Sequence, residues 1–281
     1  MNYRKQETLE TILELLETPE FRATEYPKEA YPEFEKCNYF GDVHLVFDDL
    51  VEGLDRIPSQ TEFVAEGFKV VKAYFRAKGG KISFWSKDFR TGAWSTTFIP
   101  WSDRLEKALK HRLSRTYRIH LVEYSALVSI HQLFPECWTA TDGKLDLVMG
   151  IDIVLGDSKA KELIYFHVTE NSYWGKMWKT KDKRDGYLTN ANDKKIWWER
   201  DFSQGHIGLL YDLEDSETTK VVNGNVVFKK EYLKSVIDDA FIFGDTEPLN
   251  RDCQLFKFHN FLIGNGLSEY GIKYMFNLKK K

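Results

Sequence analysis

Two apolar segments that flank a single carboxylate constrain the fold of this chain most. Residues 145–155 and 162–169 are rich in β-branched and aromatic side chains and are separated by a short polar loop. Segments of this length and composition predict two adjacent β-strands of one sheet. Asp152 lies between Ile151 and Ile153 in the first segment, where a buried carboxylate without a partner is costly. Asp152 is therefore a functional candidate, and the alternative is a structural acid that is hydrogen-bonded near a strand end.

Other patterns predict the elements around these strands. Apolar side chains at helical spacing predict helices over residues 5–17, 60–78, 102–112, 115–134 and 230–241. Ser114 is a plausible N-cap for the fourth of these helices. Turn residues predict hairpins at Thr91-Gly92, Asp142-Gly143 and Asn223-Gly224. Further strands are predicted near 137–140 and over 206–212.

Composition limits the class of protein. The chain has 281 residues, of which 42% are hydrophobic and 15% aromatic, so it is long and apolar enough to bury a sizeable core. Its net charge is −3, so any basic surface must be local. Its three cysteines are far apart and form no Cys/His cluster, which argues against a structural zinc site and suits a reducing compartment. The first residues lack the apolar core of a signal peptide, and no apolar run reaches the ~18–20 residues that span a bilayer. We therefore expect a cytoplasmic protein without a membrane anchor.

The predicted elements from 115 to 212 follow the order helix, three strands, basic segment, strand. Together with the step Gly150-Ile-Asp-Ile153, this order resembles the PD-(D/E)xK nuclease-like superfamily, whose core is helix, three strands, helix, strand. The resemblance covers about a third of the chain. It implies an α+β fold with a mixed-sheet, restriction-endonuclease-like core at 101–215. An α-rich N-terminal region with a hairpin would precede it at 1–100, and a smaller C-terminal hairpin and helical region would follow at 216–281.

The resemblance also implies a metal site. In that superfamily a carboxylate on the second core strand binds a divalent metal, and a glutamate on the preceding helix often joins it. Asp152 matches the strand acid, and Glu123, in an apolar row of the predicted helix, matches the helical acid. Oxygen ligands of this kind suit Mg²⁺ or Mn²⁺. The alternative for Glu123 is a position at the flank of the helix that reaches solvent.

The third strand departs from the superfamily pattern. Where the superfamily has an acid, one residue and a lysine, this chain has His167, Val168 and Thr169. His167 and Thr169 share a strand face, and histidine can bind a metal as neutral imidazole. The implied metal ligands are therefore Asp152, Glu123 and His167. Lys176 or Lys179 would act as a displaced cationic helper, and Asp152, His167 and Lys176 would form the catalytic set. A lone histidine on a strand is alternatively a satisfied structural residue.

The segment 173–200 is basic and holds half of the eight tryptophans. It carries eight Lys and Arg against four Asp and Glu. Lysines can neutralise phosphates, and tryptophans can stack on bases. The residues predicted to contact nucleic acid are Trp174, Lys176, Trp178, Lys179, Lys181, Lys183 and Arg184. The alternative is a core-anchored helix with a solvated lysine face.

These patterns leave two hypotheses for the function. The first is a metal-dependent phosphodiesterase that acts on nucleic acid, or a protein derived from one. The second is a catalytically inactive nuclease-fold protein that binds DNA or a protein complex as a structural or inhibitory partner. The missing acid and lysine of the third strand favour the second hypothesis, and the 42 aromatic residues suit a large interface. An oligomer whose partner chain completes the site is a third possibility.

Overall fold

The structure is a computed structural model, and it divides the chain into two compact units. It describes residues 8–26, 30–31, 43–77, 79, 81–87, 94–141, 143, 145–171, 183–189, 192, 194–201 and 204–267. The sheet unit comprises Met1–Thr11, Val122–Val221 and Val226–Lys281, and the helical unit comprises Ile12–Leu121 and Val222–Asn225. The three regions expected from the sequence, 1–100, 101–215 and 216–281, stay a prediction.

The sheet unit is built on a mixed β-sheet. Strands β3 (Trp138–Ala140), β4 (Ile153–Asp157) and β5 (Glu162–Glu170) pair antiparallel in chain order. Strand β8 (His206–Tyr211) lies parallel to β5, and the short β11 (Glu247–Pro248) pairs antiparallel with the start of β5. The predicted adjacency of the second and third strands is therefore confirmed, as is the α+β class.

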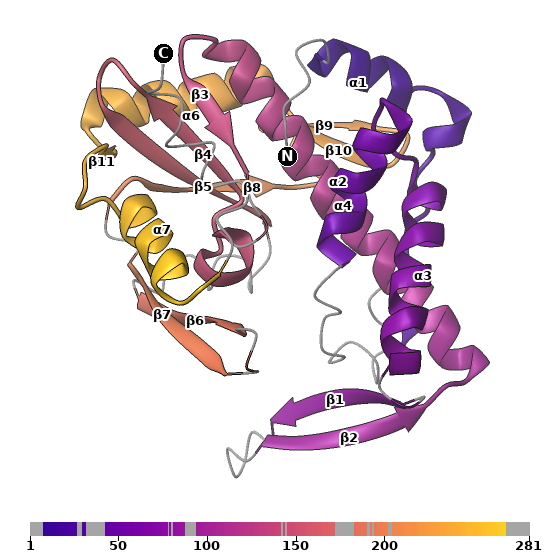
Figure 1. Cartoon of the computed structure of the whole chain (residues 1–281). Coiled ribbons are helices and arrows are strands. Elements are labelled where there is room, and N and C mark those ends of the chain that lie inside the picture. The colour runs from indigo at the N-terminus through magenta and orange to yellow at the C-terminus, as the bar shows by residue number, and fades with distance from the viewer. Residues whose placement is uncertain are drawn as a thin grey trace. The chain divides into compact units, whose positions relative to one another are not determined.

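Helices cover both faces of this sheet, because its central strand is apolar on both sides. On β5, Ile164 and Phe166 pack with the C-terminal part of α4 (Asp103–Leu133) and with α6 (Lys230–Phe243). Leu163 and Tyr165 face the opposite side, where they pack with α7 (Gln254–Gly264). Figure 1 shows α6 and α7 on opposite sides of the sheet. Alternation along one strand thus separates two hydrophobic cores.

Two smaller hairpins follow in the chain, and the turn of the second, Val222–Asn225, belongs to the helical unit. One pairs β6 (Lys183–Thr189) with β7 (Lys195–Asp201). The other joins β9 (Thr219–Val222) to β10 (Asn225–Phe228) through Asn223 and Gly224, whose φ values are 50° and 80°. Two successive positive φ angles are the requirement of a tight hairpin turn, so the prediction of this turn is confirmed.

The helical unit packs its helices around an aromatic core. Its elements are most of α1 (Leu9–Leu16), a 3₁₀ turn η1 (Pro19–Phe21), α2 (Val43–Leu54), α3 (Gln60–Ala77), a hairpin of β1 (Lys81–Lys87) and β2 (Trp94–Pro100), and the first part of α4. Phe47, Phe63 and Tyr117 are fully buried, with ring centroids 5.9–6.1 Å apart. The predicted helix over 60–78 is confirmed, as is the antiparallel pairing of the two predicted hairpin strands, whereas the predicted turn at Thr91-Gly92 lies outside the described residues.

The start of α3 is fixed by a capping box that the sequence Ser59-Gln-Thr-Glu62 encodes. The Ser59 N–H and hydroxyl donate to one Glu62 carboxylate oxygen at 2.7 and 2.9 Å. Arg56 adds a two-pronged ion pair to the same carboxylate, with distances of 2.7 and 2.9 Å. These bonds satisfy donors that the first turn of a helix otherwise leaves open.

Two predictions about local structure are wrong. The helices expected at 102–112 and 115–134 form one continuous helix, α4, and Ser114 lies inside it with its hydroxyl donating to the Lys110 carbonyl at 2.9 Å. No Gly or Pro interrupts residues 103–133, so nothing in this stretch ends the helix. Residues 145–149, expected to be strand, form a π-helical turn, η4 (Leu145–Met149), because a short buried apolar run suits either structure.

None of the described helices is long and apolar enough to cross a membrane.

Candidate functional site

Asp152 lies immediately before β4 and faces the neighbouring strand β5. Its backbone N–H donates to the Phe166 carbonyl at 2.9 Å. Its carboxylate oxygen Oδ2 accepts a hydrogen bond from the Val168 N–H at 2.5 Å. Asp152 therefore extends the pairing of β4 and β5 by one residue before Ile153, the first residue of β4. This geometry matches the structural alternative for Asp152.

His167 lies on β5 between Phe166 and Val168, and both of its ring nitrogens contact protein groups. Nδ1 contacts the Gly150 carbonyl oxygen, and Nε2 lies 2.7 Å from Nδ1 of His206. A carbonyl can only accept, so Nδ1 of His167 carries the hydrogen. In the neutral ring Nε2 is then an acceptor, and His206 Nδ1–H donates to it. Gly150, with φ of 65°, turns the chain from η4 into β4 in a conformation that glycine adopts readily.

His206 is a site residue that the sequence reasoning missed. It begins β8, where its Cα pairs with that of Tyr165. Its ring stacks on His167 with centroids 5.0 Å apart and contacts the Tyr165 ring at 4.7 Å. Because Nδ1–H of His206 donates to His167, the lone pair of the His206 ring is on Nε2. A strand was predicted over 206–212, but the register of a parallel pair cannot be read from one strand.

Tyr165 continues this polar cluster into the protein. Its hydroxyl donates to Glu247 at 2.5 Å, and Glu247 also accepts from the Gln254 N–H at 3.0 Å in the first turn of α7. Burial, followed by the charge of Glu247, raises the pKa of Tyr165 well above its usual value. The phenol therefore stays neutral and joins β5 to β11 and α7. A carboxylate beside a helix N-terminus is also electrostatically favourable.

Glu123 lies on α4 and is half-buried. Three members of its predicted apolar row, Leu127, Ile130 and Phe134, are in the core beside the sheet, whereas Ile119 is 39% exposed. Within the described part of the chain, no three His, Cys, Asp or Glu side chains are arranged to hold a metal ion. Asp152 and His167 are both hydrogen-bonded to protein groups in this arrangement. The metal set of Asp152, Glu123 and His167 stays a prediction.

The basic segment is only partly described. Trp174, Lys176, Trp178, Lys179 and Lys181 lie outside the described residues. Lys183 and Arg184 are the first two residues of β6. The described part of the segment is a β-hairpin, which differs from the helix of the alternative interpretation.

Two adjacent tryptophans on β7 have opposite environments. Trp198 is half-buried, with its ring 5.4 Å from that of Phe258 and 4.9 Å from that of Phe261, both on α7. Trp197 is 58% exposed. Successive strand residues point to opposite faces, so one indole anchors the hairpin and the other is presented to solvent.

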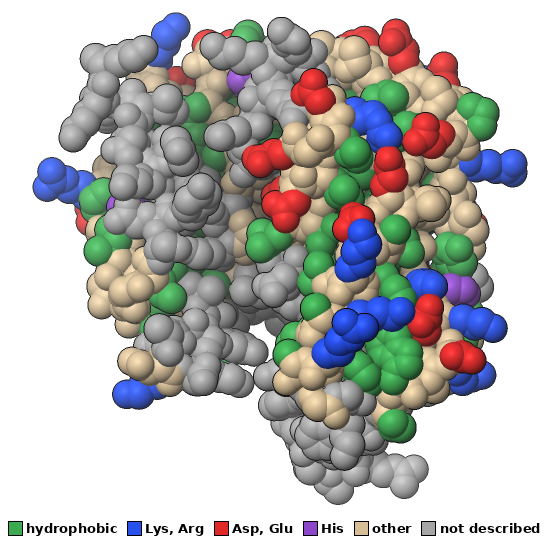
Figure 2. Space-filling model, turned by 45° about the vertical axis from the view of Figure 1, so that its right-hand side comes forward, with side chains coloured by type: hydrophobic (Ala, Val, Ile, Leu, Met, Phe, Trp, Pro, Cys, Tyr) green, Lys and Arg blue, Asp and Glu red, His purple; other side chains and the backbone are tan. Residues whose placement is uncertain are grey.

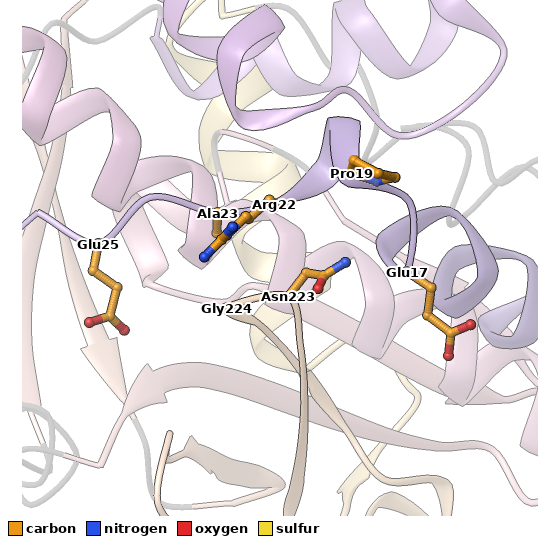
Figure 3. Close-up of a pocket in the computed structure, with 7 residues that line it drawn as sticks. All are labelled: Glu17, Pro19, Arg22, Ala23, Glu25, Asn223 and Gly224. Carbon is orange, nitrogen blue, oxygen red and sulfur yellow. The ribbon is translucent and has the colours of Figure 1, made fainter.

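The helical unit also contains an open hollow of about 480 Å³. Figure 3 shows Glu17, Arg22 and Glu25 around it, next to Asn223 and Gly224 of the hairpin turn. The Ala23 N–H donates to the Asn223 carbonyl at 2.9 Å, so the hollow surrounds the anchor of that turn. The hollow is open to solvent, and the backbone contact of Ala23 with Asn223 indicates that its lining has a structural role.

Comparisons of the chain with family models, with curated proteins and with solved structures found no match.

Proposed function

We propose that this chain is a nucleic-acid-binding protein that has a nuclease-like sheet and uses its predicted catalytic positions to hold the fold together. The sheet order supports the nuclease-like part of the proposal. Strands β3, β4 and β5 form a meander, β8 lies parallel to β5, and α4 precedes them. The superfamily places a helix between its third and fourth strands, where the described part of this chain has the β6–β7 hairpin.

One observation carries the proposal that the protein binds without hydrolysing. Asp152 accepts the Val168 N–H, and His167 uses both ring nitrogens within the protein. A metal ligand needs a lone pair directed at the ion, and a catalytic lysine would be needed to help activate water. At His167 the ring lone pair is turned to His206, one oxygen of Asp152 is turned to the Val168 N–H, and Thr169 stands where the superfamily has its lysine.

The β6–β7 hairpin supports nucleic acid as the ligand. Trp197 presents an indole to solvent, and Trp198 fixes the strand beneath it. A rigidly mounted aromatic ring is the stacking platform that single-stranded binding proteins use. The segment 173–200, to which both tryptophans belong, contains eight Lys and Arg against four Asp and Glu.

The test is fluorescence anisotropy of labelled single- and double-stranded DNA over a salt series with Mg²⁺ present, followed by gel analysis of the same samples. We expect binding that weakens steeply with salt, because condensed counterions are released on association, and no cleavage. Replacing Trp197 by Ala should weaken single-stranded binding by about 1–3 kcal/mol if a base stacks on it. Replacing Lys176, Lys179, Lys181 and Lys183 by Ala should also flatten the salt dependence. Absence of binding at low salt would overturn the proposal and favour a protein partner.

A metal-dependent phosphodiesterase remains the second candidate, because one observation favours it. Asp152 and His167 are neighbours across the β4–β5 pair, on one face of the sheet, as the superfamily motif requires. Cleavage of the labelled DNA that needs Mg²⁺ or Mn²⁺ and is lost in Asp152→Asn would support this candidate instead.

A further inference from the structure

The helical unit separates its charges along the sequence. Residues 12–66 contain fourteen Asp and Glu but four Lys and Arg, whereas residues 69–118 contain thirteen Lys and Arg but three Asp and Glu. The excess of ten positive charges in the second stretch is larger than the excess of four in the segment 173–200. The net charge of −3 does not reveal this basic stretch, because the acidic stretch offsets it. Such charge asymmetry along the sequence is typical of chains that contact polyanions.

The fold gathers part of this charge on one surface. On α3, Lys69, Lys72 and Arg76 recur at helical spacings of three and four, so they share a stripe. On α4, Lys107 and Lys110 are three residues apart, and Lys110 lies next to the α3 stripe, 4.7 Å from the Phe68 ring. We name these five cations the α3–α4 face. Figure 2 shows Lys and Arg side chains gathered around hydrophobic side chains in its lower right part.

Aromatic rings hold two of these cations in place. The ammonium groups of Lys72 and Lys110 each lie 4.7 Å from the centre of the Phe68 ring. Phe68 is itself packed on Trp101, with centroids 5.8 Å apart. Cations placed over fixed rings lose less freedom when they bind an anion, because their position is already restricted.

The carboxylates near this face do not neutralise it. Glu106 lies between Lys72 and Lys110, at 3.8 and 2.7 Å, and serves both ammonium groups. Glu66 pairs with Lys69 at 2.5 Å on an exposed surface, where such pairs are weak. Asp103, in the first turn of α4, is the third acid nearby. Five cations therefore stand against three carboxylates among the described residues of this face.

We propose that the α3–α4 face binds the sugar–phosphate backbone of nucleic acid. This proposal deepens the proposed function and rests on it. Lys69 and Arg76 are separated by about 10 Å along the helix, which is close to three steps of 3.4 Å along a nucleic-acid strand. A row of cations beside aromatic residues fits a linear chain of phosphates and bases.

A charge-removal experiment tests this surface. The variant Lys69→Ala, Arg76→Ala, Lys107→Ala removes three exposed cations and leaves Lys72 and Lys110 on their ring. The matched control Lys159→Ala, Lys220→Ala, Lys257→Ala removes three exposed cations from the sheet unit. Anisotropy with labelled duplex DNA gives the slope of log affinity against log salt. The slope should shrink by about three in the first variant if each cation meets one phosphate, and much less in the control. Circular dichroism verifies that both variants are folded.

The outcomes separate this proposal from the proposed function. If the wild-type chain binds DNA and the α3–α4 variant keeps its slope, the proposal for this face is wrong and nucleic-acid binding stands. If the wild-type chain shows no binding at low salt, both are overturned. Vesicles that contain anionic lipid provide the second probe. Binding to vesicles that the first variant abolishes, without binding to DNA, would overturn the proposal in favour of a membrane surface.

Discussion

Asp152 stabilises the junction of β4 and β5 through a charged hydrogen bond to a backbone donor. Asp152→Ala should therefore lower the free energy of unfolding by about 1–3 kcal/mol, because the Val168 N–H loses its partner. Asp152→Asn should cost less, since its amide oxygen can still accept. Chemical denaturation measures both, with the exposed Asp239→Ala as control. Equal stability of Asp152→Ala and the wild-type chain would contradict the structural role.

Glu62 gives the stability a dependence on acid. Hydrogen bonds from Arg56, followed in effect by those from Ser59, lower its pKa to about 2. A lowered folded-state pKa contributes stability above the unfolded value near 4.5, and this contribution is lost as pH falls from there towards 2. In unfolding experiments between pH 6 and 2.5, Glu62→Gln should be less stable than the wild-type chain at pH 6 by about 1–2 kcal/mol, with the gap closing in acid. A gap that stays constant over this range would refute the assignment.

The pKa of Asp48 is shifted in the opposite direction to that of Glu62. Burial raises its pKa to about 6, so the folded state holds a proton more tightly than the unfolded state. Stability contributed by this group is complete below about pH 4 and declines as pH rises through 6. Asp48→Asn should be more stable than the wild-type chain at pH 8 by about 2 kcal/mol and should not differ at pH 4. Thermal unfolding at both pH values decides this, and a variant that is destabilised at pH 8 would contradict it.

Strand β4 depends on the absence of one side chain. Gly156 pairs with Trp138, and a Cβ at Gly156 would lie 2.1 Å from the indole ring. Gly156→Ala must therefore displace Trp138 from its place beside the core under α7, at a cost of about 1–3 kcal/mol. Gly53, in α2, has open space around a new Cβ, so Gly53→Ala should stabilise the chain by about 0.5–1 kcal/mol. Chemical denaturation of the pair tests the β3–β4 register, which would be wrong if both substitutions had the same effect.

The sequence predicted individual helices, strands and turns better than it predicted how these elements pair and join. Strand β5, helix α3 and the Asn223-Gly224 turn follow from composition and spacing, and each was predicted close to its observed range. The continuity of α4 was missed because Ser114 can either cap a helix or bond back to the preceding turn. The turn η4 was missed because a buried apolar run has no distinctive period.

The candidate site shows the same division. Asp152 and His167 could be named from the sequence, because both stand on predicted strands of known alternation. Their partners could not be named, because Val168 N–H, the Gly150 carbonyl and His206 meet them only through the register of the sheet. The same residues can therefore be ligands or structural acceptors, and only the three-dimensional pairing distinguishes these roles.

For the molecule as a whole, charge matters more than its total suggests. The net charge of −3 combines an acidic stretch at 12–66 with a basic stretch at 69–118. Because salt screens exposed charges over a Debye length of about 10 Å at 0.1 M, a local basic surface can act on a polyanion despite a negative total. The α3–α4 face and the β6–β7 hairpin belong to different compact units. Their contributions to nucleic-acid affinity should therefore be separable by the two sets of lysine and arginine substitutions described above.

We propose that Asp152 and His167 hold the sheet together and do not bind a metal ion. Isothermal titration of Mn²⁺ into the purified wild-type chain and into Asp152→Asn tests it most directly. We predict the same weak, nonspecific heats for both proteins, because Asp152 and His167 are already engaged with protein groups. Stoichiometric binding of Mn²⁺ by the wild-type chain that disappears in folded Asp152→Asn would contradict the claim and establish a metal site.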